Sequence, residues 1–449
     1  MRGLESVRRE VAGLWAGGAG KTLLAIALGW GLLNGTRMIY PVLLPELSDA
    51  FGLTLVTGGF LVSLIWLCYA IGQVPGGVLA DRYGERRVLT ASVTIVVLGV
   101  VLVLFAPTAL VLFAATGVVG LGLSQYPIAR ITALSDLYPD RIGGALGITM
   151  ASGDVGQTVL PPIATVLAGV AAWQLGLGYV LPLLVLVAIV LWVTVPPTER
   201  ANGRSDEESD ERTDGQSDER SDEKPNDDRR SDAAKRSDGG QSDDDNRSDD
   251  GKSNDDGPDA TIRDVLPILR TPTFGFMWVI LFLFIFVWQT FSAFYPTYLM
   301  TVKGFSPAVA GSIFGLFFAF GVVVKPLAGV AYDRVGLRRS LPIVLGGAIV
   351  GLAVLPALEG FWPIVGVTVL IATMLGSGAI TQAYLADAIP REIQGTGLGI
   401  IRSSGAMLGA TGPVIFGAVA ERGFFDEGYV ALAGIVALVT VLTLLMPDE

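Results

Sequence analysis

Residues 77–87 have the sequence GVLADRYGERR, and residues 329–339 repeat it as GVAYDRVGLRR, 252 positions later. Each copy, which we call a signature loop, lies at the junction between two long apolar runs. Other matches occur in the same order, so the chain contains an internal duplication. Three further pairs support it: Asp136-Leu-Tyr-Pro139 with Asp387-Ala-Ile-Pro390, Leu146-Gly147-Ile148 with Leu398-Gly399-Ile400, and Tyr40-Pro41 with Tyr295-Pro296.

The composition indicates a membrane protein. Hydrophobic residues make up 51% of the 449 residues and charged residues 16%, with a mean hydropathy of +0.57, which leaves too few polar side chains to cover a soluble protein. Roughly 20 apolar residues cross a bilayer core about 30 Å thick, and they are too many for a barrel strand. Twelve such runs occur: 22–44, 54–80, 88–106, 109–137, 143–171, 175–196, 272–300, 306–331, 340–358, 361–388, 396–419 and 428–446.

The predicted fold class is therefore an all-α membrane protein with twelve transmembrane helices in two pseudo-symmetric, six-helix halves. Such duplicated architectures place a transport site between the halves, near the middle of the membrane. The predicted domains are a cytoplasmic N-terminal segment at 1–21, an N-terminal half at 22–197, a disordered acidic cytoplasmic linker at 198–262, and a C-terminal half at 263–449.

The acidity of the chain is confined to the linker. Residues 205–259 contain 22 acidic and 9 basic residues, whereas the net charge of the whole chain is -11. The rest of the chain is close to neutral, so the overall acidity says nothing about a substrate. The segment has almost no apolar residues with which to form a core. Lys is scarce among the basic residues, which favours a halophilic source over an ordinary acidic linker.

Basic residues in the short loops predict the orientation. One set of loops carries most of them, including both signature loops and Arg141 and Arg391, whereas the opposite set carries only Lys303 and Arg422. Both termini and the linker are therefore expected in the cytoplasm, with the protein in the cell membrane.

The residue types exclude several kinds of function. The chain has no His and a single Cys, Cys68, so a disulfide framework, a His-based triad and a His/Cys metal site are excluded. No pattern of carboxylates suggests catalysis. We expect no enzyme activity, no metal, no cofactor and no nucleic-acid partner.

The first signature loop resembles the signature of the major facilitator superfamily, and its second copy strengthens the resemblance. The resemblance implies a cytoplasmic gate in which Asp81 and Asp333 pair with basic groups or helix N-termini and hold the outward-facing state. The alternative is that the loop arginines only set the topology. The expected gating residues are Gly77, Asp81, Arg82, Gly84, Arg86, Arg87, Gly329, Asp333, Arg334, Gly336, Arg338 and Arg339.

Two departures weaken drug efflux as the function. Proton-coupled drug antiporters of this superfamily carry an Arg motif near the start of helix four, where this chain has Thr116-Gly-Val-Val-Gly120. Their fifth helix carries a G-x-x-x-G-P motif, which is absent from residues 153–162.

Five ionisable residues fall inside predicted helices, where charge is costly and marks functional sites. Four are cations, and the single acid is Asp154, so the surplus charge favours an anionic substrate held by Arg forks. The alternative is that Arg130, Lys325 and Arg402 extend to the cytoplasmic surface. The resemblance points the same way, because some organic-anion members use cations on helices one and four, or eight and eleven. The candidate cations are Arg37, Arg130, Lys325 and Arg402.

Asp154 is the candidate for proton coupling. A carboxylate in a low-dielectric environment takes up a proton more readily, and it releases the proton when water reaches it. The alternative is a static ion pair with Arg130 or Arg37.

Polar and aromatic residues on the first and seventh helices complete the predicted substrate site: Asn34, Tyr40, Gln289 and Tyr295. For each of them, helix packing is the alternative. The predicted function is a monomeric secondary transporter that rocks its two halves around a small organic anion, coupled to protons. The alternatives are drug or neutral-solute efflux and, more remotely, a non-transporting sensor.

Overall fold

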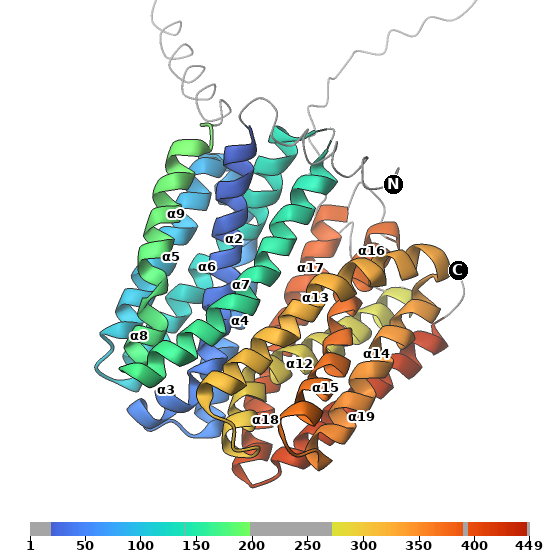
Figure 1. Cartoon of the computed structure of the whole chain (residues 1–449). Coiled ribbons are helices and arrows are strands. Elements are labelled where there is room, and N and C mark those ends of the chain that lie inside the picture. The colour runs from blue at the N-terminus through green and yellow to red at the C-terminus, as the bar shows by residue number, and fades with distance from the viewer. Residues whose placement is uncertain (1–18, 140, 198–271, 389–393, 447–449) are drawn as a thin grey trace, which may run out of the picture. The chain divides into compact units, whose positions relative to one another are not determined.

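The computed structural model describes residues 19–139, 141–197, 272–388 and 394–446, and every regular element in these ranges is helical. Figure 1 shows the first half of the chain, in blue to green, as one group of helices and the second half, in yellow to red, as another. The N-terminal half contains α2 (Ala19–Val42), α3 (Leu44–Phe51), α4 (Leu55–Tyr83), α5 (Glu85–Leu104), α6 (Ala109–Leu137), α7 (Ile142–Val170), α8 (Trp173–Gly178) and α9 (Val180–Thr194).

The C-terminal half is built in the same order. It contains α12 (Pro272–Thr301), α13 (Pro307–Val335), α14 (Leu337–Val354), η2 (Leu355–Ala357), α15 (Phe361–Ala372), η3 (Thr373–Gly376), α16 (Ser377–Ala388), α17 (Gln394–Gly409), α18 (Thr411–Glu421) and α19 (Phe425–Leu445). Each of the twelve predicted runs corresponds to one helix or to consecutive helical pieces, which confirms the predicted fold class. The predicted N-terminal segment and linker lie largely outside the described residues.

Three predicted spans are interrupted in the structure. The eleventh breaks between α17 and α18 at Ala410, because Pro413 has no N–H to donate and its ring clashes with the carbonyl four residues earlier. The tenth passes through the 3₁₀ turn η3, and the sixth changes at Tyr179 from α8 to α9. Such interruptions bend a helix locally without removing it from the bundle.

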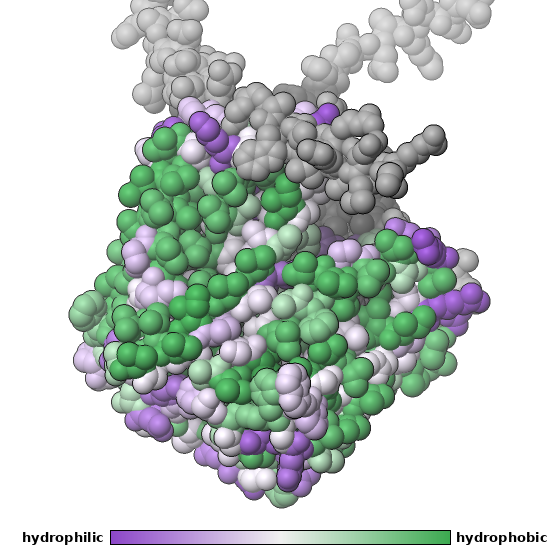
Figure 2. All heavy atoms as spheres, viewed as in Figure 1, coloured by the Kyte–Doolittle hydropathy of each residue, from purple (hydrophilic) through white to green (hydrophobic). Residues whose placement is uncertain are grey.

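Membrane embedding follows from the helices and from the surface. Within the described residues, eleven spans are long and apolar enough to cross a bilayer. The remaining long helix, α7, has 29 residues and carries Asp154 in its interior. Figure 2 shows hydrophobic side chains covering the flanks of the helices, whereas hydrophilic ones gather toward the helix ends.

The signature loops turn on glycines at equivalent positions. Gly84 joins α4 to α5 with φ of 80° and ψ of 153°, and Gly336 joins α13 to α14 with φ of 72° and ψ of 178°. Only glycine adopts this region without strain. The duplication therefore repeats the backbone path of the turn as well as its sequence.

Replacing Gly336 with Ala is expected to destabilise the protein by roughly 1–3 kcal/mol, because the new Cβ strains this backbone conformation. Nothing lies within 4 Å of the position of that Cβ, so the effect isolates backbone strain from collision. Gly329→Ala is the matched control, because Gly329 lies inside α13 and an added Cβ there also meets nothing. Thermal unfolding in detergent should show a lower midpoint for Gly336→Ala only; equal midpoints would contradict this account.

Candidate functional site

Arg37 lies in the interior of α2 and is only 8% exposed. Its Nη2 donates a hydrogen bond to Asn34 Oδ1 at 2.7 Å, one helical turn earlier. Its guanidinium carbon lies 4.0 Å from the centroid of the Trp66 ring on α4. No carboxylate of the described residues lies within ion-pair distance of Arg37, and its Nε has no hydrogen-bond partner among them. The neighbours thus fix the guanidinium without neutralising it.

Arg130 on α6 is held in a similar way. Its Nη1 donates to Thr149 Oγ1 on α7 at 2.9 Å, and its guanidinium carbon lies 4.1 Å from the centroid of the Trp30 ring. Trp30 is in turn stacked on Tyr126. Stacking on a tryptophan face stabilises and orients a guanidinium.

Asp154 on α7 forms an ion pair with Lys325 on α13, with 2.5 Å between Oδ1 and Nζ. The pair joins the two halves, and its members differ in access: the Asp154 side chain is 6% exposed and that of Lys325 is 31% exposed. The alternative prediction, an ion pair of Asp154 with Arg37 or Arg130, is therefore wrong, because the partner is Lys325.

Arg37 and the ion pair are connected by direct neighbours. Asn34, which accepts from Arg37, has its amide nitrogen 3.6 Å from where a Cβ of Gly153 would lie. Gly153 precedes Asp154 in α7, and Asp154 binds Lys325. Arg37 of the N-terminal half and Lys325 of the C-terminal half are therefore linked through neighbouring residues of α7.

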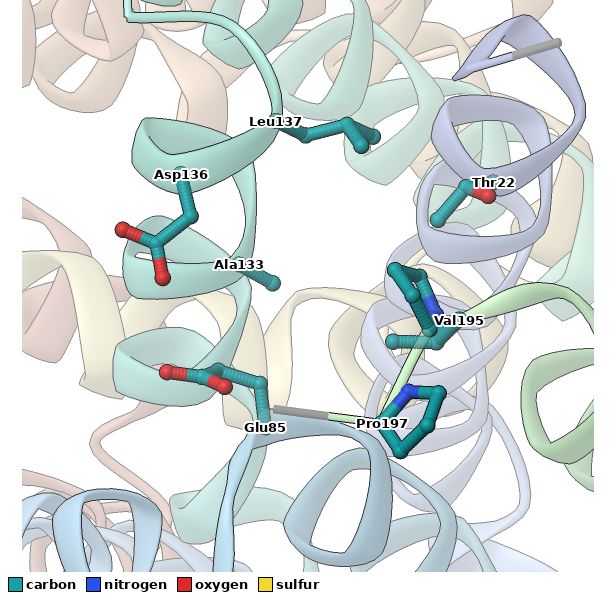
Figure 3. A pocket seen from close by; sticks show the side chains of 8 residues that line it. Thr22, Glu85, Ala133, Asp136, Leu137, Val195 and Pro197 are labelled. Atoms are coloured by element: carbon teal, nitrogen blue, oxygen red, sulfur yellow. The ribbon is translucent and has the colours of Figure 1, made fainter. Parts of the chain in front are cut away.

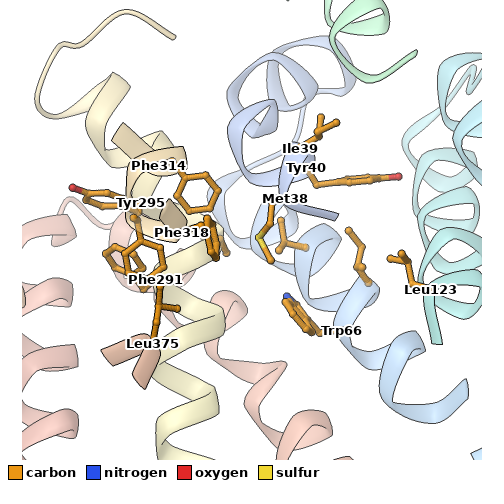
Figure 4. Close-up of a cluster of buried hydrophobic side chains, with 14 of the residues drawn as sticks. Met38, Ile39, Tyr40, Trp66, Leu123, Phe291, Tyr295, Phe314, Phe318 and Leu375 are labelled. Atoms are coloured by element: carbon orange, nitrogen blue, oxygen red, sulfur yellow. The ribbon is translucent and has the colours of Figure 1, made fainter. Parts of the chain in front are cut away.

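The remaining predicted site residues lie in different surroundings. The Tyr295 hydroxyl pairs with Thr368 on α15 at 2.5 Å, inside the C-terminal half. Tyr40 is 1% exposed, and Figure 4 shows its ring directed toward the side of Leu123 on α6, away from Phe291 and Tyr295. Gln289 donates to the Ala406 carbonyl, and its Oε1 is buried without a partner among the described residues. The side chain of Arg402 lies outside the description.

The sequence reasoning missed the tryptophans beside the arginines. Trp30 precedes Asn34 by four residues and Arg37 by seven, a spacing that places all three on one face of a helix and offered a usable signal. Trp66 gave no such signal. Its ring meets that of Trp288 on α12 edge to face, with centroids 4.8 Å apart, so the support of Arg37 extends into the C-terminal half.

The two halves also pack together at the helix ends opposite the signature loops, which we call the distal ends. There Val56, in the first turn of α4, donates its N–H to Glu421 at the end of α18 at 3.3 Å. An added Cβ at Gly417 would collide with Leu55, and one at Gly315 on α13 would collide with Thr158 on α7. Glycines thus permit close crossings at both contacts between the halves.

A cavity of about 190 Å³ lies elsewhere, within the N-terminal half near the first signature loop. Figure 3 shows the carboxylates of Glu85 and Asp136 on the same side of it, away from Thr22 and Val195. It contains none of the cations described above, so we do not regard it as the substrate site. Its lining consists of Thr22, Glu85, Ala133, Asp136, Leu137, Val195, Pro196 and Pro197.

A family comparison supports the same fold that the helices, the duplication and the signature loops indicate. The model of the Major Facilitator Superfamily matches residues 25–381 and 277–449. The chain belongs to the Major Facilitator Superfamily. Transport is the activity of this superfamily, so the chain is a membrane transporter and not an enzyme.

Relatives within the superfamily differ in how much of the chain they cover. A probable sulfoacetate transporter of Cupriavidus necator is 26% identical over 436 residues, 92% of each chain. A niacin transporter of Acinetobacter baylyi is 31% identical over 131 residues, 29% of this chain and 30% of the relative. A probable galactarate/D-glucarate transporter of Escherichia coli is 28% identical over 164 residues, 35% and 36% of the two chains.

Solved superfamily structures share the fold. A bacterial homologue of the human lysosomal transporter Spinster, inward-facing and unoccupied, matches with a TM-score of 0.73 at 16% identity over 96% of this chain and 97% of the other. A D-xylose–proton symporter matches with a TM-score of 0.71 at 14% identity, covering 96% and 98%.

An arginine of each signature loop contacts the last helix of its own half. The Arg86 guanidinium carbon lies 4.3 Å from the centroid of the Trp192 ring on α9, and Arg338 at the equivalent position donates to the Leu444 carbonyl of α19 at 2.6 Å. Asp333 is exposed. The side chains of Val78 and Asp81 in the first signature loop are not among those that the structure describes. The role of the aspartates in a gate therefore stays a prediction.

Replacing Gly315 with Trp is expected to hold the distal ends apart, because an added side chain would collide with Thr158 across the halves. The readout is labelling of Thr165→Cys, in a Cys68→Ser background, by a membrane-impermeant maleimide. Thr165 is 1% exposed, so the parent should label slowly and the Gly315→Trp variant several times faster. Gly434→Trp is the control, because an added Cβ there meets nothing. Unchanged labelling in a folded Gly315→Trp variant would show that this contact does not close the distal end.

Proposed function

We propose that this transporter is a secondary carrier that moves a small organic anion together with protons, by alternating access between its two six-helix halves. The proposed orientation has the signature loops and both termini in the cytoplasm of a cell-membrane protein, as the distribution of basic residues predicts. The substrate site comprises Arg37, Asn34 and Arg130 of the N-terminal half and Lys325 of the C-terminal half.

The observation that carries the proposal is that Arg37 is buried with no carboxylate beside it among the described residues. A cation buried in the membrane interior is costly unless an anion accompanies it. The described residues give Arg37 a hydrogen-bond acceptor and an aromatic face but no carboxylate. An anionic substrate supplies the missing charge and meets a guanidinium that is already oriented.

The relatives support the same class of substrate. The names of the transporters for sulfoacetate, niacin and galactarate/D-glucarate all denote organic acids, which are anions at neutral pH. The match to the sulfoacetate transporter extends over 92% of the chain and so includes both halves.

Asp154 is the proposed proton carrier. It is buried in α7 between the halves, and with no His in the chain a carboxylate is the natural group to carry a proton across a transport cycle. Its ion pair with Lys325 crosses the interface that alternating access must remodel.

A thermal-shift screen of the purified protein tests the substrate class. The panel contains monocarboxylates, dicarboxylates, sulfonates, sugar acids and lipophilic cations. We expect stabilisation by organic anions that is absent from the Arg37→Gln variant. Stabilisation by lipophilic cations alone, equal in both proteins, would overturn the proposal.

One observation favours drug efflux as a second candidate. The multidrug resistance protein Stp of Mycobacterium tuberculosis is 29% identical over 185 residues, 40% of this chain and 34% of the relative. The lipophilic-cation arm of the screen distinguishes the two candidates, because a buried arginine repels a cation.

A further inference from the structure

The ion pair between the halves has the properties of an occupied anion site. Lys325 is a cation in the membrane-spanning part of α13, and the carboxylate that binds it among the described residues comes from the opposite half of the protein. The Lys325 side chain is 31% exposed, whereas the carboxylate that binds it is 6% exposed. The Lys325 side chain is therefore the more accessible member of the pair.

We propose that Asp154 acts as an internal substitute for substrate: its carboxylate occupies an anion subsite on Lys325, and the second acidic group of a dianionic substrate replaces it when Asp154 takes up a proton. This inference rests on the proposed function and specifies its substrate as a small organic acid with two ionised groups. One group binds Arg37 in the N-terminal half and the other binds Lys325 in the C-terminal half.

Residues of α7 lie between the two cations. Asn34, which binds Arg37, lies beside Gly153 of α7, and the next residue, Asp154, binds Lys325. A substrate that binds both cations would lie across the same interface that the ion pair now joins. Because it replaces that pair, the link between the halves is preserved during the exchange.

The charge balance explains why a proton must accompany the dianion. Without protonation, the substrate group that reaches Lys325 would lie beside the ionised Asp154 carboxylate, and like charges at close range in a low-dielectric region repel strongly. With the proton on Asp154, Lys325 no longer has a competing carboxylate partner there, and a substrate group can bind it. The proton and the dianion therefore bind together and leave together, with one proton per dianion.

Among the described residues, no other acid lies in the interior of the helices that pack on α7. Helix α7 carries no ionisable residue other than Asp154, and α8 carries none among its residues. Among the helices that pack on α7, α2 contributes Arg37, α6 contributes Arg130 through Thr149, and α13 contributes Lys325. The other charged residues on these three helices lie in their end turns: Lys21, Asp136, Asp333 and Arg334.

The test measures binding of matched dianions and monoanions to the full-length protein in detergent. The probes are succinate with butyrate, and sulfoacetate with acetate and methanesulfonate. We expect the wild-type protein to prefer the dianions, with a dianion affinity that falls by up to about tenfold per pH unit as Asp154 loses its proton, as one-proton linkage requires. Monoanion affinity should depend on Arg37 and little on pH.

Three variants separate the outcomes. Asp154→Asn should bind dianions with no pH dependence, because Lys325 is then permanently available. Lys325→Gln should lose the preference for dianions while retaining monoanion binding. The Asp154→Asn/Lys325→Gln double variant leaves no unpaired buried charge, so it remains folded if the single variant at Lys325 does not, and it should also lose the preference.

The results distinguish this inference from the function on which it rests. If no probe binds in an Arg37-dependent way, the proposed anion site is wrong and this inference falls with it. If Arg37-dependent binding is present but the dianion-to-monoanion ratio is the same in wild type and in the double variant, only the subsite on Lys325 is overturned. Parallel pH dependences in wild type and Asp154→Asn would also overturn it.

Discussion

Replacing Arg37 with Gln is expected to lower the affinity for an organic anion by about 2–5 kcal/mol, the usual cost of removing one partner of a buried, hydrogen-bonded charge pair. That corresponds to a loss of roughly 30-fold to several thousandfold in the dissociation constant. The expected size is large because Asn34 and Trp66 already orient the guanidinium, so little of its binding energy is spent on ordering. Calorimetric titration and uptake into proteoliposomes measure it.

Two further variants identify the cause of that loss. Arg37→Lys keeps the charge but not the planar fork, so it should bind with intermediate affinity. Arg422→Gln removes an exposed arginine beyond the end of α18 and should leave binding unchanged. Equal affinity of the Arg37→Gln variant and the wild type would remove Arg37 from the site.

Replacing Asp154 with Asn is expected to abolish proton-driven accumulation while sparing exchange of substrate across the membrane. Asn is nearly isosteric with Asp but cannot carry a proton, so the coupled step is lost while the halves can still rock. Proteoliposomes with an imposed pH gradient measure accumulation, and counterflow of labelled substrate without a gradient measures exchange.

The matched control for this substitution is Asp49→Asn, at an exposed position in α3. It should leave both accumulation and exchange unchanged. Driven accumulation that persists in the Asp154→Asn variant would refute the role of Asp154 as the proton carrier. Loss of accumulation and exchange together would indicate instead that the ion pair with Lys325 is needed for the conformational change itself.

The helices and their order could be predicted because lipid leaves the backbone few choices. A run of about 20 apolar residues satisfies its own hydrogen bonds only as a helix. The interruptions were harder to foresee. Pro413 predicts the break in the eleventh span, but the turn η3 in the tenth contains no proline and depends on how that span packs.

The short helix α3 was absent from the predicted spans for a different reason. Its eight residues, Leu44–Phe51, are too few to cross a bilayer, so they do not form an apolar run of spanning length. Local signals were nevertheless present. Pro45 lies in its first turn, and Gly52 ends it with φ of 65°.

In the candidate site, the residues could be predicted from the sequence but their contacts could not. Its charged residues were evident in the sequence, because any ionisable group inside an apolar run is unusual. Their partners were not. Arg37 and Arg130 were each considered as the partner of Asp154, whereas the structure pairs Asp154 with Lys325, 171 residues away in the chain.

The signature loops therefore define what the sequence determines by itself. Their repetition, the apolar runs on either side and the positive-φ glycines at their turns follow from local chemistry and fix a duplicated, twelve-helix transporter. Only the tertiary structure decided which buried charges meet, which tryptophans support the arginines, and where the halves touch. Those contacts join residues far apart in the chain, and their distances depend on how whole helices pack, which no local pattern specifies.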